Sequence, residues 1–177
     1  MLLAIDVGNT QTVVGVYQEK RLLHQWRVAT NKQHTSDELR VKLAPLLLSE
    51  GIATQHLEGV ALASVVPQLT QAWCAAVERM TGSEALVCSA EAAGGLFSTE
   101  YANPAEIGAD RVADAVAAKA LYGAPVVVVD FGTATNIEVI DAEGRFVGGV
   151  IAPGVETSAQ ALFSRATRLG AIELVAP

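Results

Sequence analysis

Two short stretches decide the fold of this chain: Asp6-Val7-Gly8-Asn9 near its start and Asp130-Phe131-Gly132-Thr133 in its last third. In both, an aliphatic run ends on an aspartate, a glycine and a hydrogen-bonding residue follow, and a second run rich in β-branched residues begins. This pattern predicts two strands joined by a tight turn. Because it occurs twice in matching contexts, it predicts a duplicated α/β unit.

Each stretch opens a predicted three-stranded meander. The strands are expected at residues 2–6, 12–17 and 22–28 in the first copy, and at 126–130, 136–141 and 145–151 in the second. Between the copies, buried strands at 60–66 and 85–88 flank an amphipathic helix at 68–81, and that order predicts a parallel crossover. Further helices are expected at 109–121 and 156–168.

One helix start has a specific signal. Thr35-Ser36-Asp37-Glu38 has capping-box spacing before an apolar run, which predicts a helix that begins there and ends before Gly51. Pro45 falls inside this helix, so we expect a kink or a second start at that position. Trp26 and Trp73 are interpreted as core residues.

The second copy has no crossover strands after the helix at 156–168. A sheet left at that stage would have an open edge and an uncovered apolar face, which natural domains avoid. We therefore expect a truncated chain, with an N-terminal domain and interdomain helix at 1–122 and the start of an incomplete second domain at 123–177.

Composition excludes several classes of function. No apolar run approaches the roughly 18 residues of a spanning helix, and the N-terminus lacks the basic flank of a signal peptide, so we expect a soluble cytoplasmic protein without a membrane partner. A net charge of -7 argues against nucleic-acid binding. Cys74 and Cys88 have no metal-ligand spacing and are interpreted as buried thiols, and His24, His34 and His56 are scattered.

The two turns have the residue types of phosphate-binding loops. Glycine at Gly8 and Gly132 permits close approach of backbone N–H groups to phosphate oxygens, and Asn9, Thr10 and Thr133 add side-chain donors. Asp6 and Asp130 would repel a polyphosphate unless a cation lay between, which favours magnesium. A single turn of this kind is most often an ordinary hairpin, but its repetition favours ATP-dependent phosphoryl transfer.

A third element, Gly108-Ala109-Asp110-Arg111, stands at the start of the helix before the second meander. Asp110 can be a general base for a substrate hydroxyl, or merely an acidic residue favoured by the helix dipole. Arg111 can hold an anionic substrate or form a surface ion pair. Tyr101, just upstream, can line a ligand pocket or pack on the surface, and the segment alone does not distinguish these alternatives.

Six motifs occur in order along the chain: Asp6 to Thr10, Ser64 to Pro67, Tyr101 to Pro104, Gly108 to Arg111, Asp130 to Thr135 and Gly148 to Gly154. Together they resemble type III pantothenate kinase over the whole chain. The resemblance implies the actin-like ATPase fold of two ribonuclease-H-like domains, with the nucleotide between them. It also implies phosphorylation of pantothenate by ATP to 4'-phosphopantothenate, the first step of coenzyme A synthesis. The cofactors implied are magnesium and a monovalent cation, K⁺ or NH₄⁺, and homodimers are usual in the family.

The resemblance also implies roles for individual residues. Asp6, Val7, Gly8, Asn9, Thr10, Gln11, Thr12 and Val13 would form the first phosphate loop, with Thr133 as a further ATP contact. Asp130 would hold the monovalent cation and Asp6 the magnesium ion. Tyr101 and Gly108, Ala109, Asp110 and Arg111 would bind pantothenate, with Asp110 as the catalytic base.

Two other functions remain open at this level. The two loops alone also fit a related kinase or phosphatase that acts on a sugar or an acid, although the Gly108 to Arg111 element argues against it. A non-catalytic accessory factor of gene regulation is the third alternative, since family chains continue beyond the equivalent of Pro177 with further substrate and adenine contacts. Retention of Asp6, Asp110 and Asp130 argues against that alternative.

Overall fold

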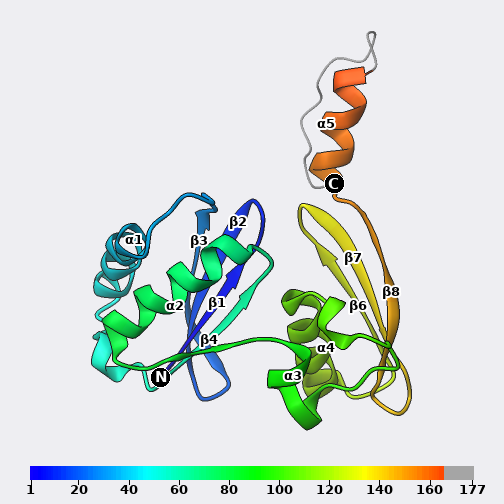
Figure 1. Ribbon diagram of the computed structural model, residues 1–177, viewed down its shortest axis with the longest axis horizontal. Coiled ribbons are helices and arrows are strands. Elements are labelled where there is room, and N and C mark those ends of the chain that lie inside the picture. Colours follow the sequence, from blue (N-terminus) through cyan, green and yellow to red (C-terminus); the bar gives the residue numbers. More distant parts are fainter. Residues whose placement is uncertain (166–177) are drawn as a thin grey trace. The chain divides into compact units, whose positions relative to one another are not determined.

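β1 (Leu2–Val7) is the central strand of the larger sheet in the computed structural model, and the strand order is β3-β2-β1-β4-β5 (Figure 1). β2 (Gln11–Gln18) pairs antiparallel with β1, and β3 (Arg21–Ala29) pairs antiparallel with β2. β4 (Gly59–Ser64) and β5 (Ala85–Val87) extend the sheet on the other side in parallel register. The predicted meander and parallel crossover are therefore confirmed.

The structure describes residues 1–165, and the chain divides into two units. The first, here called the N-terminal unit, comprises Met1–Phe97 and Ala102–Asp114. The second, the C-terminal unit, comprises Ser98–Tyr101 and, within the described range, residues 115–165.

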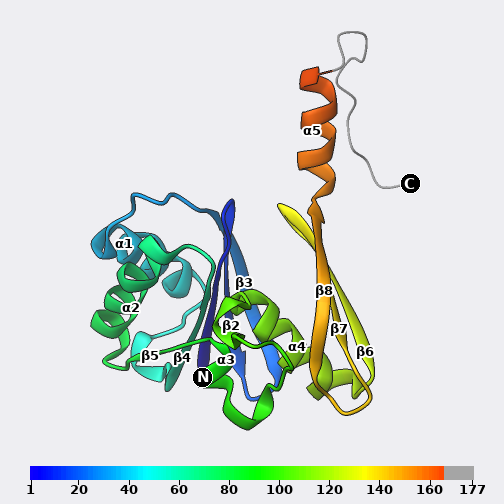
Figure 2. The same cartoon turned by 45° about the vertical axis from the view of Figure 1, so that its right-hand side comes forward.

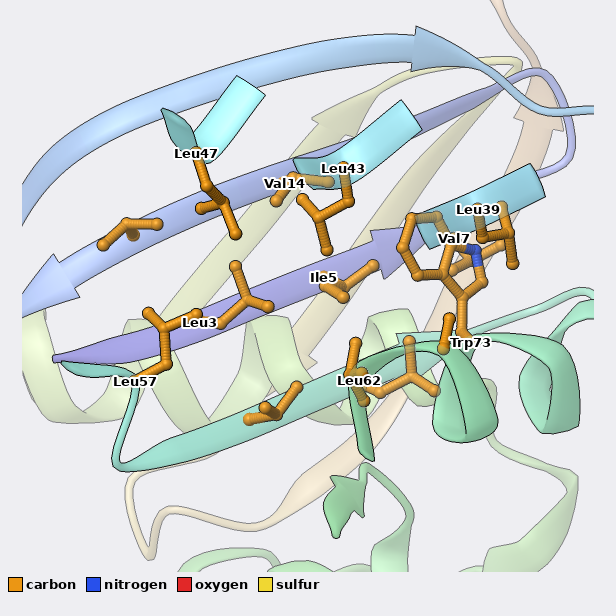
Figure 3. Close-up of a cluster of buried hydrophobic side chains, with 14 of the residues drawn as sticks. Leu3, Ile5, Val7, Val14, Leu39, Leu43, Leu47, Leu57, Leu62 and Trp73 are labelled. Atoms are coloured by element: carbon orange, nitrogen blue, oxygen red, sulfur yellow. The ribbon is translucent and has the colours of Figure 1, made fainter. Parts of the chain in front are cut away.

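The core of the N-terminal unit lies between its sheet and two helices, α1 (Ser36–Ser49) and α2 (Pro67–Thr81). Alternate residues of β1 face these helices because side chains in a strand alternate between faces, and Leu3, Ile5 and Val7 are at most 2% exposed. Figure 3 shows them with their partners Val14, Leu39, Leu43, Leu47, Leu57, Leu62 and Trp73. Burial of each large aliphatic side chain contributes roughly 1.5–3 kcal/mol, so this cluster dominates the stability of the unit.

The start of α1 has the predicted capping box. The Glu38 backbone N–H donates to Thr35 Oγ1 at 3.3 Å, and the Thr35 N–H donates to Glu38 Oε2 at 2.8 Å. Pro45 lies on the exposed side of one continuous helix, so no second helix starts there. Water can solvate the carbonyl that proline leaves without a donor, which explains why the helix persists.

α2 connects β4 to β5. Pro67 stands in its first turn, where the missing N–H costs nothing, and Gly82 ends it in the left-handed region with φ 76°. Trp73 of α2 is buried as expected, while Trp26 is half-buried and stacks on His24. Four short elements were not predicted: α3 (Ala90–Ala93) and 3₁₀ turns at Thr54–His56, Gly94–Leu96 and Pro104–Glu106.

The C-terminal unit contains the second meander, in which β6 (Val126–Phe131), β7 (Ala134–Ile140) and β8 (Phe146–Pro153) form an antiparallel sheet in that order (Figure 2). α4 (Ala109–Tyr122) starts in the N-terminal unit and continues in the C-terminal unit from Ala115. α5 (Val155–Arg165) follows β8. This helix was predicted to reach residue 168, and residues 166–168 lie outside the described range.

Candidate active site

The first predicted phosphate loop is the turn between β1 and β2. The Gly8 N–H donates to the Gln11 carbonyl at 3.0 Å, which closes the turn. A Cβ at Gly8 would lie 2.9 Å from that carbonyl oxygen, closer than real Cβ atoms come, so the turn requires glycine. Asn9 and Thr10 form the exposed tip. Because the Gly8 N–H is used inside the turn, Asn9 and Thr10 at the exposed tip are the better placed residues to meet a phosphate.

The base of this loop is anchored to β3 by threonines. The Thr30 N–H donates to the Thr10 carbonyl at 2.9 Å, and the hydroxyls of Thr12 and Thr30 lie 2.9 Å apart. Thr12 is only 2% exposed and Val7 is fully buried, so their side chains pack inside the unit and support the loop. Of the residues predicted to bind ATP, the exposed ones in this stretch are Asp6, Asn9, Thr10 and Gln11.

The loop adjoins a second turn at the end of the neighbouring parallel strand. The Val65 N–H donates to the Val7 carbonyl at 3.1 Å, which ties the end of β4 to the end of β1. Ser64 fixes this turn, since its hydroxyl accepts from the Val66 N–H at 3.2 Å and from the Thr70 hydroxyl at 3.0 Å. The carboxyl ends of parallel strands are the usual place for ligand sites in α/β folds.

The Gly108 to Arg111 element lies beside Val65, at the turn that follows β4. A Cβ built on Gly108 would lie 3.8 Å from Val65 Cγ1, so Val65 stands between the β1 end and the start of α4. The same Cβ would lie 2.5 Å from Asp110 Oδ1, which shows that glycine at 108 leaves room for this carboxylate. The N-terminal unit thus brings together the Gly8 turn, Val65 and Asp110.

Asp110 is half-buried in the first turn of α4. Its Oδ1 accepts from the Arg111 N–H at 2.8 Å, and that bond orients the carboxylate. Cys88 lies beside it, with its thiol directed at the Ala109 carbonyl at 3.4 Å. Burial, and then the charge of Asp110, raise the pKa of Cys88 above its ordinary value, so the thiol stays protonated at neutral pH. Both cysteines are half-buried instead of fully buried.

The second predicted loop joins β6 to β7 in the C-terminal unit, and it is one residue shorter than the first. The Gly132 N–H donates to the Ala134 carbonyl at 2.9 Å, whereas Gly8 donates to the third residue along. The end pairs Val7↔Thr12 and Phe131↔Thr135 show the same difference in length. Asp130 and Thr133 are exposed, as Asp6 and Asn9 are in the first copy.

Two residues that were given no individual role from the sequence, Gly154 and Thr157, hold the second loop. The Gly154 N–H donates to the Thr133 carbonyl at 3.0 Å, and the Thr157 hydroxyl donates to the same oxygen at 2.9 Å. A Cβ at Gly154 would overlap the carbonyl oxygens of Gly132 and Thr133. Gly154 belongs to a recognised motif, so its glycine was a usable signal, but a lone Thr157 in a helix gave none.

The predicted site residues are thus divided between the units. Asp6 to Val13 and Gly108 to Arg111 lie in the N-terminal unit, while Tyr101, Asp130 and Thr133 lie in the C-terminal unit. Within the described residues, no cluster of three or more His, Cys, Asp or Glu side chains is arranged to hold a metal ion. Among those same residues, no helix is long and apolar enough to cross a membrane.

Comparison with known proteins identifies the family. The family model described as type III pantothenate kinase matches residues 2–177. The chain belongs to the type III pantothenate kinase family. A type III pantothenate kinase from Moorella thermoacetica is 44% identical over 177 residues, and one from Roseiflexus castenholzii is 45% identical over 177 residues. Both alignments cover 100% of this chain and 69% of the relative.

A solved structure supports the fold. A conserved protein from Campylobacter jejuni, described as a Baf family transcriptional activator, superposes with a TM-score of 0.53 at 20% identity, covering 95% of this chain and 62% of that chain. At this identity the likeness concerns the fold alone and says nothing of a regulatory role. The α/β class and the actin-like ATPase fold expected for a type III pantothenate kinase are thereby confirmed.

Proposed function

We propose that this chain phosphorylates pantothenate with ATP, giving 4'-phosphopantothenate in the first step of coenzyme A synthesis. The observation that carries the proposal is the meeting of the glycine turn after β1 with Asp110 through Val65. A turn that suits phosphate therefore lies near a carboxylate that suits a hydroxyl proton, in a chain of the type III pantothenate kinase family.

ATP binding is assigned to Asp6, Val7, Gly8, Asn9, Thr10, Gln11, Thr12 and Val13 together with Thr133. Asn9 and Thr10 form the exposed tip of the first turn and offer backbone and side-chain donors to phosphate oxygens. The turn closure by Gly8 and the Thr12–Thr30 contact keep that tip in place before ATP arrives. A preorganised loop gives affinity because less conformational freedom is lost on binding.

Cations complete the assignment. The exposed carboxylate of Asp6 fits Mg²⁺, which in nucleotide sites uses one or two carboxylates and the phosphates, and the ion would neutralise charge on the transferred group. The exposed Asp130 carboxylate fits a monovalent cation, K⁺ or NH₄⁺. Both assignments rest on oxygen donors at the strand ends that carry the two loops.

Pantothenate binding is assigned to Tyr101, Gly108, Ala109, Asp110 and Arg111. The guanidinium of Arg111 is suited to the carboxylate of pantothenate. Asp110 Oδ2 takes the proton of the substrate hydroxyl while the hydroxyl oxygen forms a bond to the γ-phosphorus and the bond from that phosphorus to ADP breaks. In such reactions positioning and charge stabilisation supply most of the rate.

We propose a cytoplasmic homodimer without nucleic-acid or membrane partners, in keeping with the net charge of -7. We also propose domains at 1–122 and 123–177, with α4 as the connecting helix.

The test is Asp110→Asn in the full-length protein, with ADP release as the readout. We expect kcat for pantothenate to fall by roughly 10²–10⁴, the usual contribution of a general base. Asp37→Asn is the matched control, because Asp37 occupies the first turn of α1 and forms only exposed ion pairs with Arg40 and Arg79. Near-normal turnover in Asp110→Asn removes Asp110 as the base, and a wild-type protein that phosphorylates a sugar but not pantothenate contradicts the proposed function.

A further inference from the structure

We propose that Thr99 is a positioning residue for Tyr101 and thereby sets the affinity for pantothenate. The inference rests on the proposed function, which assigns Tyr101 to the substrate. It starts from the unusual course of the chain at this point. Ser98–Tyr101 belongs to the C-terminal unit, although the residues before and after it belong to the N-terminal unit.

The segment is held on β8 by backbone pairing. Thr99 forms a parallel bridge with Phe146, and the Phe146 N–H donates to the Ser98 carbonyl at 2.7 Å. The Thr99 hydroxyl donates to the Phe146 carbonyl at 2.8 Å and accepts from the Tyr101 N–H at 3.2 Å. One hydroxyl therefore links the backbone of Tyr101 to the first residue of β8.

The ring of Tyr101 is oriented by the same strand. It meets the ring of Phe146 edge-on, with centroids 5.6 Å apart and planes at 70°. Phe146 is 1% exposed and therefore fixed, whereas Tyr101 is 39% exposed. The Tyr101 hydroxyl lies close to Gly148, since a Cβ built on Gly148 would be 3.6 Å from the hydroxyl oxygen. The ring is thus held at one edge while its remaining surface stays open to a ligand.

An ion pair flanks this arrangement but contributes less. Arg145 contacts Glu100, and also Asp141 at 2.7 Å and Glu143 at 3.5 Å. The Glu100 and Arg145 side chains are 66% and 41% exposed, and solvent screens exposed pairs of this kind so that they hold a segment only weakly. The hydroxyl of Thr99 is part-buried and bonds to the backbone on both sides. We therefore assign the positioning to Thr99 and not to the ion pair.

The experiment uses Thr99→Val in the full-length protein, since valine keeps the branched shape and removes the hydroxyl. We expect KM for pantothenate to rise about 5–10-fold, with kcat at saturating pantothenate and KM for ATP within about 2-fold of wild type, which is the pattern for loss of uniform binding. Thr99→Ser restores the hydroxyl and the wild-type KM. Glu100→Gln, the control for the ion pair, changes KM by less than about 2-fold.

A double-mutant cycle separates positioning from general damage. In a Tyr101→Ala background, Thr99→Val has no further effect on KM, because the residue through which it acts is gone. An equal rise in both backgrounds, or no rescue by serine, overturns the inference. Independently of activity, hydrogen exchange of the Tyr101 amide becomes faster in Thr99→Val; unchanged protection also overturns it. Failure of the proposed function gives a different result. The wild-type protein then does not phosphorylate pantothenate, while hydrogen exchange of the Tyr101 amide is still faster in Thr99→Val.

Discussion

At the scale of single residues, Gly108 governs the direction of the Asp110 carboxylate. In Gly108→Ala, the new Cβ would lie 2.5 Å from Asp110 Oδ1. The carboxylate would rotate away, because it is the terminal group of a flexible side chain. We expect kcat for pantothenate to fall about 10–100-fold, as small misplacements of catalytic groups do, while the melting temperature changes little. Gly95→Ala, where a Cβ meets open space, is the control. A Gly108→Ala variant with normal kcat would falsify this role.

Cys88 reports the charge of Asp110 without any assay of activity. Burial and the Asp110 charge both raise the pKa of the Cys88 thiol, so Asp110→Asn removes the second cause and lowers that pKa towards its ordinary value. Alkylation by iodoacetamide requires the thiolate, so its rate rises at lower pH in Asp110→Asn than in wild type. The measurement uses a Cys74→Ala background, and Asp37→Asn leaves the titration unchanged. If the pH midpoint of Cys88 alkylation is the same in Asp110→Asn and wild type, the Asp110 carboxylate does not lie beside Cys88.

Residue patterns indicated the two turns and the Gly108 to Arg111 element, but not the residues that hold them in place. The Asp-x-Gly turns and the Gly108 to Arg111 element were visible in the sequence because their residue types are unusual in combination. Thr99 and Thr157 were not, since a single threonine in a loop or helix has no pattern around it. Their contacts lie 47 and 24 residues away along the chain, and only the folded backbone brings the partners together.

At the scale of elements, the capping box of α1 was predicted in full and gives a direct test. Thr35→Ala removes the acceptor for the Glu38 N–H and costs about 1 kcal/mol of unfolding free energy. Hydrogen bonds from the Thr35 backbone and hydroxyl lower the pKa of Glu38. The ionised Glu38 side chain therefore adds to the unfolding free energy above the ordinary glutamate pKa. This contribution is lost as the pH falls through the lowered pKa of Glu38.

Urea denaturation at neutral and at acid pH measures this effect. The difference between wild type and Thr35→Ala should shrink as the pH falls, because wild type then loses its share of the cap as well. Ser36→Ala, one residue further along, is the control, since the cap bond comes from Thr35 and not from Ser36. A cost independent of pH means that Glu38 does not take part.

Element length decided what the sequence could show. The strands and helices of six residues or more were predicted, and their predicted positions agree with the structure to within two residues in most cases. α3 has four residues and the 3₁₀ turns have three each, too few for any periodic signal. Pro45 misled in a different way, because the rule against proline in helices weakens where the freed carbonyl meets water.

At the scale of the whole molecule, the duplication was visible from the sequence but the course of the chain between the units was not. Ser98–Tyr101 belongs to the C-terminal unit, and its backbone bridge Thr99↔Phe146 follows no hydrophobic period in the sequence. The shorter second turn was also hidden, because the motifs align residue for residue up to Thr133 and differ only in where the partner strand begins.

The sheet of the C-terminal unit has an apolar face whose exposure can be tested in the 177-residue chain. Cross-strand pairing places Val127 opposite Val139 and Val129 opposite Ile137, on the same face as Val150. Within the described part of the chain, Val127, Val129 and Val150 are 58%, 45% and 57% exposed.

Exposed apolar patches promote association, so we expect the double variant Val127→Thr, Val129→Thr to bind less of the dye ANS and to aggregate less on heating. Threonine keeps the β-branched shape that suits a strand, so unfolding free energy changes by less than about 0.5 kcal/mol per site. Val41→Thr is the control, because Val41 is 73% exposed but lies on α1. Equal dye binding by the double variant and this control means that the face is covered in solution.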